Sequence, residues 1–421
     1  MNFRFQPWNI NEQFLLPPTL DEYVPEDHLS YFVRDLVSEH LDLDKIYASY
    51  HPTMGKPAHN PEMMLALLLY SYCRGVYSSR KIATACHERL DYKVIVGTSC
   101  PDFRRVGEFR KRHFPVLKDL FLQVLELCRE AGLVKLGHVS IDGTKIRANA
   151  SKHKAMSYGR MQPTVKKLRA EVNEWLDKAK AADESEDAMF GANCTGQEMP
   201  GWCKTKKDRI EKIKAAKKAL EERIKSDDDD EPPTKPTAKD QTNFTDSESR
   251  IMPTSEGFQQ AYNAQAAVDA DSQVIVASSV TQQTNDKKQL IPMIADIKAN
   301  VGQNPAEISA DSGYCSEANL KNVSRKKLKL YVATGRQQHG KKSAAKRSTL
   351  KFTEIMSTKL KRAGFRSRYR LRKQTVEPVF GQIKSARSFR QFLTRGLKNV
   401  AAEWELICMA HNILKLRSAT A

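Results

Sequence analysis

Three carboxylates in this sequence stand where they could act on one substrate. Asp142 follows the alternating stretch "HVSI" and Asp311 follows "EISA", each on the polar side of a predicted strand with a glycine close behind it. Glu377 lies farther along, in "RKQTVEPVFGQIK", which is otherwise rich in Lys and Arg. Three carboxylates that converge in a positive setting can hold two divalent cations, which activate a water and stabilise the leaving oxygen in phosphodiester chemistry.

Each of these acids also has a simpler interpretation when it is taken alone. The residues around Asp142, "IDGT", resemble a hairpin turn, and Asp311 could be a turn residue or a helix cap. Glu377 could form an ordinary salt bridge on a surface helix. The metal-binding interpretation rests on the joint pattern of two aspartates at strand ends and a glutamate on a later helix.

The segment around Glu377 has the spacing of an amphipathic helix. At about 100° per residue, one apolar stripe contains Val376, Val379, Phe380 and Ile383, and its flank contains Arg370, Lys373, Glu377 and Lys384. Pro378 allows two arrangements, since the helix either begins there or passes through it with a kink. We favour the kinked helix, because Glu is a poor N-cap residue.

Composition restricts the class of protein. The chain has 421 residues and a formal charge of +19, which favours a polyanionic partner, either nucleic acid or an anionic membrane surface. It shows neither a signal peptide nor an apolar run near the roughly 18 residues that span a bilayer. These absences predict an intracellular protein with no membrane partner. Its eight cysteines show no CxxC pairing, so we expect no zinc site and a reducing compartment.

Residues 1–130 read as a helical domain. Helices are predicted in "NPEMMLALLLYSYCRG", in "SSRKIATACHERL" and across "PDFRRVGEFRKRHFPVLKDLFLQVLELCREAG", with a turn containing "VGTS" between the last two. These two could form a helix-turn-helix on DNA, for which the candidate contacts are Arg104, Arg105, Arg110 and Lys111. The alternative is a helical bundle with a solvated basic face.

The period changes from helical to alternating near residue 136. Residues 136–155 begin an α/β domain, 156–240 form an insertion of two helices and an acidic linker, "SDDDDEPPTKPTAKD", and 241–421 complete the α/β domain. The last part contains a hairpin around "DADS", a helix in "KKQLIPMIADIKANVG", strands in "AEISADSGYC" and "LKLYVATG", and a final amphipathic helix. This order predicts a mixed sheet with helices on both faces.

Three blocks of the chain resemble a known family. "SIDGTKIRANAS", "ISADSGYCSEANL" and "YRLRKQTVEPVFGQIKSARSFRQFLTRGL" resemble the catalytic blocks of bacterial insertion-sequence transposases of the DDE class, and "NPEMMLALLLYSYCRGVYSSRKIATA" resembles their helical N-terminal domain. The resemblance implies an α/β RNase H-like mixed sheet with a helical N-terminal domain and a helical-hairpin insertion. It also implies that Asp142, Asp311 and Glu377 are the catalytic, metal-binding triad.

The third block matches the family's pattern with one shift. Related transposases have a Tyr, an Arg three positions on, a Glu four after that and a Lys seven farther. Tyr369 and Arg372 keep the first spacing, while Glu377 and Lys384 keep the last. Arg372 lies five positions before Glu377, so Lys373 occupies the expected basic position. Whether Arg372 or Lys373 contacts a DNA phosphate stays open, and Arg370 and Tyr369 are further candidates. Lys384, two turns from Glu377 on the same side, is the firmer assignment.

The resemblance implies a DNA transposase that cleaves phosphodiester bonds at transposon ends and transfers the strand into target DNA. Two Mg²⁺ ions would be its cofactors, with Mn²⁺ as a substitute. Its partners would be double-stranded DNA, as terminal inverted repeats and as target, and a second copy of the chain in the active complex. The alternatives are a DNA-binding protein that has lost catalysis and an RNase H-like nuclease without strand transfer.

Other polar residues are weaker candidates. Asp269 and Asp271 fall in the expected hairpin turn, and Asp246 suits an Asx-turn or a cap. His153 and His411 lack partners at metal-ligand spacing. We therefore expect these five residues to have structural roles.

Overall fold

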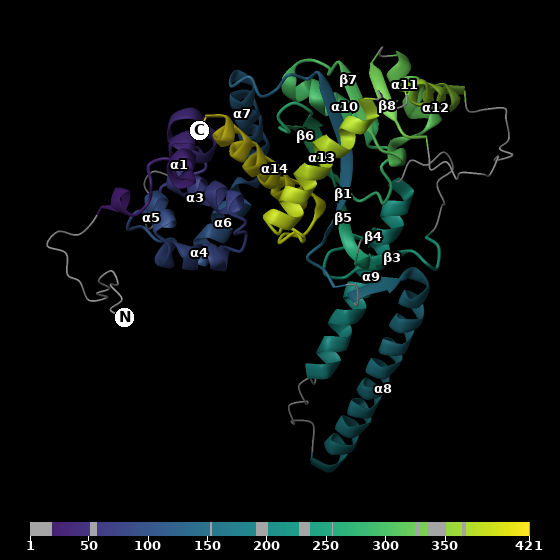
Figure 1. The fold of residues 1–421 in the computed structure, drawn as a ribbon. Helices are drawn as coiled ribbons and strands as arrows, with labels where there is room; N and C mark the ends of the chain where they lie inside the picture. Colours follow the sequence, from purple (N-terminus) through teal and green to yellow (C-terminus); the bar gives the residue numbers. More distant parts are fainter. Residues whose placement is uncertain are drawn as a thin grey trace, which may run out of the picture. The chain divides into compact units, whose positions relative to one another are not determined.

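A computed structural model describes residues 19–50, 57–151, 154–190, 201–226, 236–254, 256–325, 328–334, 351–363 and 368–420. The chain divides into two compact units (Figure 1). The first contains the residues up to Lys135, Asp271–Ile275 and the residues from Glu405 onward, and the second contains Leu136–Ala270 and Val276–Trp404. No helix in the described part of the chain has the length and apolarity that a membrane span requires.

The first unit is helical, as the sequence predicts. Its helices are α1 (Leu29–His40), α2 (Asp44–Tyr47), α3 (Pro61–Cys73), α4 (Ser79–Glu88), α5 (Leu90–Val96), α6 (Phe103–His113) and α7 (Leu117–Glu130). The Asn60 side chain caps α3 by accepting hydrogen bonds from the backbone N–H groups of Glu62 and Met63. Every α3 residue from Met64 to Cys73 is buried, so this helix forms the centre of the unit.

Two expectations for this unit are wrong in detail. The region between α4 and α6, predicted as a turn, contains the helix α5, so these helices do not form a simple helix-turn-helix. Only seven residues long, α5 is stabilised by the burial of Tyr92, Val94 and Ile95, which local propensity does not reveal. The long helix predicted after it is broken by a 3-10 turn at Phe114–Val116, because Pro115 has no N–H to continue the ladder.

The end of the chain belongs to the helical unit, although the sequence places it in the α/β domain. Helix α14 (Leu397–Thr420) contributes its residues from Glu405 onward. Its Asn412 side chain exchanges two hydrogen bonds with the backbone of Ile275, at 2.8 and 2.9 Å. The Sγ of Cys73 in α3 donates to the carbonyl oxygen of Ala410 at 3.5 Å. These buried contacts give the helical unit part of its core.

The second unit contains the predicted mixed sheet. Its strands are β1 (His138–Arg147), β4 (Arg250–Thr254), β5 (Gly257–Asp269), β6 (Ile275–Thr281), β7 (Glu307–Ala310) and β8 (Lys329–Val332). They lie in the order β4-β5-β1-β7-β8, with β6 paired to β5. β1 is antiparallel to β5 and parallel to β7, and β7 is parallel to β8. β1 therefore lies between the antiparallel and the parallel parts of the sheet.

Helices connect and cover these strands. α10 (Leu290–Val301) precedes β7, α11 (Glu317–Arg325) joins β7 to β8, and α12 (Lys351–Ala363) follows. α13 (Leu371–Gly381) packs on β1, β5 and β7, and its residues Val376 and Val379 are buried. The helix passes through Pro378 and ends in a π-helical turn at Gln382–Ala386, so it does not begin at the proline.

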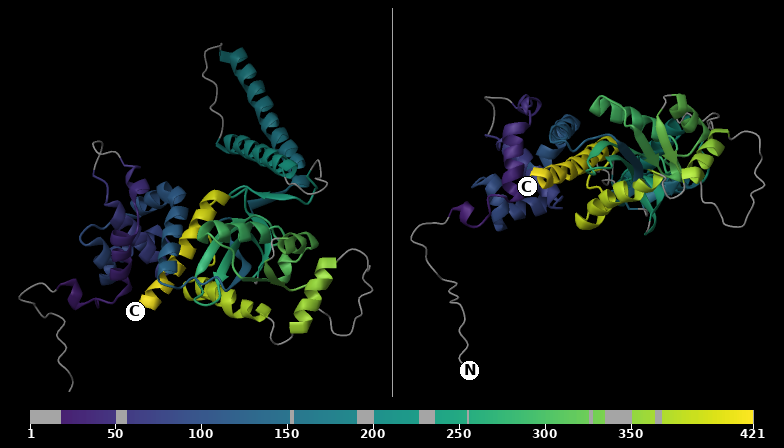
Figure 2. Two further views of the ribbon diagram at one scale, coloured as in Figure 1. Left: turned by 90° about the horizontal axis from the view of Figure 1, so that it is seen from above. Right: turned by 45° about the horizontal axis from the view of Figure 1, so that its top comes forward.

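The insertion is the predicted helical hairpin. The short paired strands β2 (Ala155–Ser157) and β3 (Gln241–Asn243) enclose α8 (Tyr158–Phe190) and α9 (Gly201–Ser226), which lie next to each other in Figure 1 and are seen from above in the left view of Figure 2. Contacts from Tyr158 to Glu221 and from Glu171 to Lys206 show that the helices are antiparallel. Their shared core consists of Met161, Val165, Leu168, Ile210, Ile213, Leu220 and Ile224. The acidic linker falls mostly outside the described residues.

Replacing Glu405 by Gln should stabilise the helical unit in a pH-dependent way. Burial raises the pKa of Glu405 to about 7, and Asp119 adds to this while Lys118 opposes it. Because the folded state prefers the protonated acid, the contribution of Glu405 to the free energy of unfolding falls as the pH rises from about 4 to about 7. We expect Glu405→Gln to add about 1–2 kcal/mol at pH 8 and almost nothing at pH 5.

Urea unfolding followed by circular dichroism at the two pH values measures this difference. The same gain at both pH values would contradict the assignment of a raised pKa to Glu405.

Candidate active site

The register of the parallel strands places two of the predicted acids side by side. β1 pairs with β7 from His138↔Glu307 to Ile141↔Ala310, and the next residue on each strand is Asp142 or Asp311. One oxygen of each carboxylate accepts a backbone hydrogen bond at 2.8 Å, from Gly143 for Asp142 and from Gly313 for Asp311. Both side chains are thus held next to each other. Asp311 directly follows β7, but β1 continues past Asp142 to Arg147, so the expectation that Asp142 ends its strand is wrong.

Arg372 connects the third predicted acid to this pair. From the start of α13, its Nη1 lies 2.5 Å from Oδ2 of Asp142, and its Nη2 lies 3.2 Å from Oε1 of Glu377. The side chains of Asp142 and Arg372 are largely buried, whereas that of Glu377 is 49% exposed. The structure therefore brings Asp142 and Glu377 to one guanidinium group, which forms ion pairs with both acids in this arrangement.

The acids influence one another's charge. Burial raises the pKa of Asp142 to about 6, with Asp311 and Asp286 adding to the rise, while Arg372 and the N–H of Gly143 oppose it. Burial also raises the pKa of Asp311, and Asp286 acts in the same direction. Mutual repulsion of this kind is relieved when cations bind between the carboxylates.

Asp286 is a site residue that sequence reasoning missed. It lies after β6, and its Oδ1 accepts hydrogen bonds from Asn263 at 2.6 Å and Gln265 at 2.8 Å. Both amide side chains are fully buried on β5. Their alternation in the otherwise apolar stretch "AYNAQAAV" was the available signal, because buried amides require polar partners.

Gly143 permits the close approach of these groups to β1. A Cβ at this position would lie 2.3 Å from Nε2 of Gln265 and 2.8 Å from Oδ1 of Asp286. The register places Gly143 directly opposite Gln265. The glycine therefore belongs to the packing beneath the acids, and it is not the turn residue that "IDGT" alone would suggest.

The predicted basic residues of the third block take different positions. Lys384 lies in the π-helical turn and donates to the carbonyl oxygen of Lys145 at 2.9 Å. Arg370 and Lys373 are exposed, and Tyr369 is half-buried. Lys384 is thus attached to β1, the strand of Asp142.

The candidate contacts of the helical unit also separate into two groups. Arg104, Arg105 and Lys111 are exposed on α6. Arg110 is buried and donates to the hydroxyl of Tyr72 at 3.2 Å and to the carbonyl oxygen of Tyr77 at 3.1 Å. Arg110 therefore packs inside the helical unit and presents no surface to DNA in this structure.

Most of the weaker candidates have structural partners. The buried Asp269 accepts a hydrogen bond from the N–H of Leu136 at 2.7 Å, and the buried Asp246 accepts one from the hydroxyl of Tyr262 at 2.8 Å. His411 is buried and lies 2.8 Å from the carbonyl oxygen of Gln273. His153 lies outside the described residues.

The carboxylates of Asp142, Asp311 and Glu377 suit a hard divalent cation. Carboxylate oxygens are the ligands that Mg²⁺ and Mn²⁺ prefer. Asp142 and Glu377 already share one cationic group, the guanidinium of Arg372, so their oxygens converge on positive charge. Across the described ranges, no three His, Cys, Asp or Glu side chains form a ready-made metal cluster. The residue types and their placement fit a metal ion. To bind it, the carboxylates must move closer together.

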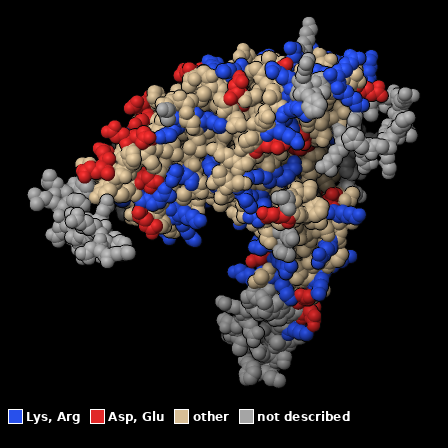
Figure 3. Space-filling model, in the orientation of Figure 1, with Lys and Arg blue, Asp and Glu red and all other residues tan. Residues whose placement is uncertain are grey.

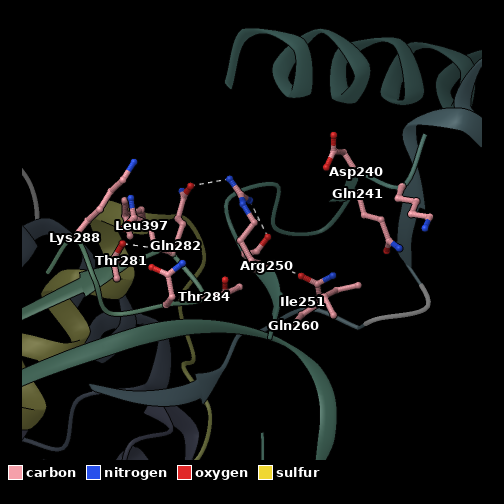
Figure 4. Close-up of a pocket in the computed structure, with 14 residues that line it drawn as sticks. Asp240, Gln241, Arg250, Ile251, Gln260, Thr281, Gln282, Thr284, Lys288 and Leu397 are labelled. Atoms are coloured by element: carbon pink, nitrogen blue, oxygen red, sulfur yellow. Dashed lines mark hydrogen bonds between the residues drawn. The ribbon is translucent and has the colours of Figure 1, made fainter. Parts of the chain in front are cut away.

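A polar cavity lies along the segment that leads to Asp286. Its volume is about 610 Å³, and its lining includes five amide side chains: Gln241, Gln260, Gln282, Gln283 and Asn285. Figure 4 shows Arg250 reaching Gln282, at a distance of 2.7 Å. The lining also contains the cationic side chains of Lys239 and Lys288 and the carboxylate of Asp240. On the face of the second unit drawn in Figure 3, Lys and Arg outnumber a few acidic side chains.

Comparison with family models decides the class of this protein. Residues 18–112 match the model of a transposase domain, and residues 233–413 match that of the transposase DDE domain. The chain belongs to the DDE transposases. Its mixed sheet is accordingly RNase H-like, and the family binds DNA and uses divalent metal ions. Comparisons with curated proteins and with solved structures gave no match.

The matched residues include only part of the candidate site. Asp286, Asp311, Glu377 and Lys384 lie within the DDE match, whereas Asp142 lies in neither match. The structure of the transposase supplies the missing connection, because β1 carries Asp142 to the end of β7.

Replacing Gly143 by Ala should destabilise the second unit of the transposase. The added methyl group would displace Gln265, which also accepts a hydrogen bond from the hydroxyl of Tyr314. We expect a loss of about 1–3 kcal/mol in the free energy of unfolding, measured by urea denaturation. Gly137→Ala is the matched control, because a Cβ there meets no atom within 4 Å. Equal stability of the two variants would contradict the close packing of Gln265 against β1.

Proposed function

We propose that this transposase cleaves phosphodiester bonds at the ends of its own element and joins the freed 3′ ends to target DNA, with Asp142, Asp311 and Glu377 as its catalytic residues. One observation carries the proposal. The parallel pairing of β1 and β7 sets Asp142 beside Asp311, and Arg372 connects Asp142 to Glu377. Such a convergence of carboxylates is what metal-dependent phosphodiester chemistry requires.

Asp142, Asp311 and Glu377 would hold two Mg²⁺ ions, for which Mn²⁺ is a suitable substitute. When bound, such ions activate the attacking water or 3′-hydroxyl and stabilise the leaving oxygen. The protein contributes orientation, because the N–H groups of Gly143 and Gly313 fix the two aspartates on rigid strands. Glu377 lies on α13 and is more exposed, so its side chain can adjust its position to a bound metal ion.

Arg372 carries a permanent positive charge beside the same acids. When Asp142 and Glu377 bind metal, this guanidinium becomes available for a DNA phosphate. Tyr369, Arg370, Lys373 and Lys384 are the other residues of the third block that we assign to DNA contact.

Recognition of the element is assigned to the helical unit. Arg104, Arg105 and Lys111 are exposed on α6 and suit the phosphates of double-stranded terminal inverted repeats. A homodimer would hold two ends together for joining to one target. We place this activity in the cytoplasm, on DNA of the nucleoid.

Glu377→Gln is the first test of this function. On a labelled DNA fragment that carries the element's own ends, we expect the variant to lose Mg²⁺-dependent cleavage and strand transfer by on the order of 100-fold or more. DNA binding should persist, because the substitution removes a charge that faces the metal. Glu354→Gln, at an exposed acid on α12, is the matched control and should retain activity.

The products distinguish the remaining possibilities. Cleaved ends without joined products from the unaltered protein would indicate a nuclease without strand transfer. Binding without cleavage would indicate a DNA-binding protein that has lost catalysis, and full activity of Glu377→Gln would contradict the role of this carboxylate.

A further inference from the structure

Lys145 is a largely buried cation next to the acidic site. It follows Asp142 by three residues on β1, and its side chain is 18% exposed. Its Nζ lies 3.5 Å from Oδ1 of Asp286. Burial lowers the pKa of Lys145, while Asp286, Asp311 and Asp142 all raise it. The ammonium group is therefore held in the electrostatic field of all three aspartates.

The same lysine lines a small basic groove. The groove has a volume of about 220 Å³, and its lining consists of Lys145, Arg147, Thr254, Glu256, Lys384, Ser385 and Arg390. Four of these side chains are cationic, against one carboxylate, and Glu256 lies 3.4 Å from Arg147. A net positive concavity of this size fits phosphate groups of a nucleic acid backbone.

Backbone contacts hold the cations of this groove in place. Lys384 donates to the carbonyl oxygen of Lys145 at 2.9 Å, and Nε of Arg390 donates to the carbonyl oxygen of Lys384 at 3.2 Å. Lys145 and Arg147 lie on β1, Lys384 lies in the π-helical turn that follows α13, and Arg390 lies shortly after that turn. The groove therefore joins the strand of Asp142 to the block that contains Glu377.

Asp286 is fixed more firmly than a surface acid. Asn263 and Gln265 donate to its Oδ1, the atom that also faces Lys145. The register places Lys145 opposite Asn263, so the lysine and the amides share one face of the sheet. Asp286 thus offers the ammonium group of Lys145 a rigid partner.

We propose that the groove binds the DNA backbone beside the bond that is cut, with Lys145 contacting a phosphate and Asp286 as the positioning residue that sets the Lys145 ammonium. This inference rests on the proposed function, because it places the groove beside the catalytic acids. It adds Lys145, Arg147 and Arg390 to the DNA-binding residues and gives Asp286 a role that does not require it to touch metal or DNA.

The test measures DNA binding without divalent ions, so that cleavage does not enter. Fluorescence anisotropy of a labelled end fragment gives Kd at several salt concentrations. We expect Lys145→Gln to weaken binding about 3- to 10-fold and to reduce the slope of log K against log salt by roughly 0.9, the value for one lost phosphate contact. Lys145→Arg should restore the slope. Lys298→Gln, at an exposed lysine on α10, is the matched control.

Asp286→Asn separates positioning from simple charge. Removing an acid near DNA tightens binding if only net charge matters, whereas losing the anchor of Lys145 weakens it. We expect weaker binding, and a double variant that binds no more weakly than Lys145→Gln alone. Circular dichroism melting of each variant checks that the fold is retained.

Two results would overturn the proposal. One is an unchanged Kd and salt slope for Lys145→Gln, and the other is tighter binding or simple additivity for Asp286→Asn. Failure of the proposed function is a separate outcome, because the protein would then bind DNA through Lys145 but cleave nothing in the assay with the element's ends.

Discussion

The candidate site depends on one constraint, the parallel register between β1 and β7. It places Asp142 and Asp311 next to each other in a partly buried position, where like charges repel and where burial disfavours ionisation. A fold keeps such a pair only if positive charge is near. Arg372 and Lys145 supply it from two sides, and the fold's remaining features at this end of the sheet hold these cations in position.

Rigidity at the site comes from groups that carry no net charge. Asn263 and Gln265 are buried amides in the centre of the sheet, and they orient Asp286, while Gly143 leaves the space that they occupy. A member of such a network that lacks a hydrogen-bond partner would destabilise the folded state. The position of the acids therefore depends on the packing of β1 against β5. The more exposed Glu377 is outside this network and is the adjustable member of the proposed triad.

Much of the fold followed from local patterns, and the failures have physical causes. Alternation predicted the strands next to Asp142 and Asp311, although β1 continues past Asp142 to Arg147, and the apolar stripe predicted α13. The helix α5 and the short strands β3 and β4 were missed, because a few residues carry too little periodicity and tertiary packing decides their structure. Asp286 was missed for another reason: it lies in a polar loop, and only the strand pairing reveals that Asn263 and Gln265 face it. The π-helical turn that contains Lys384 also changes the geometry that ideal helical angles give.

The position of α14 has a consequence for the synthesis of this protein. Buried residues such as Leu406, Met409 and Ile413 belong to the helical unit, which otherwise consists of the first part of the chain and the short segment Asp271–Ile275. The ribosome therefore releases the α/β sheet before it supplies the last piece of the helical core. The unit to which we assign recognition of the element's ends is completed last, so a truncated chain that already contains all three proposed catalytic acids still lacks part of the unit that would direct them.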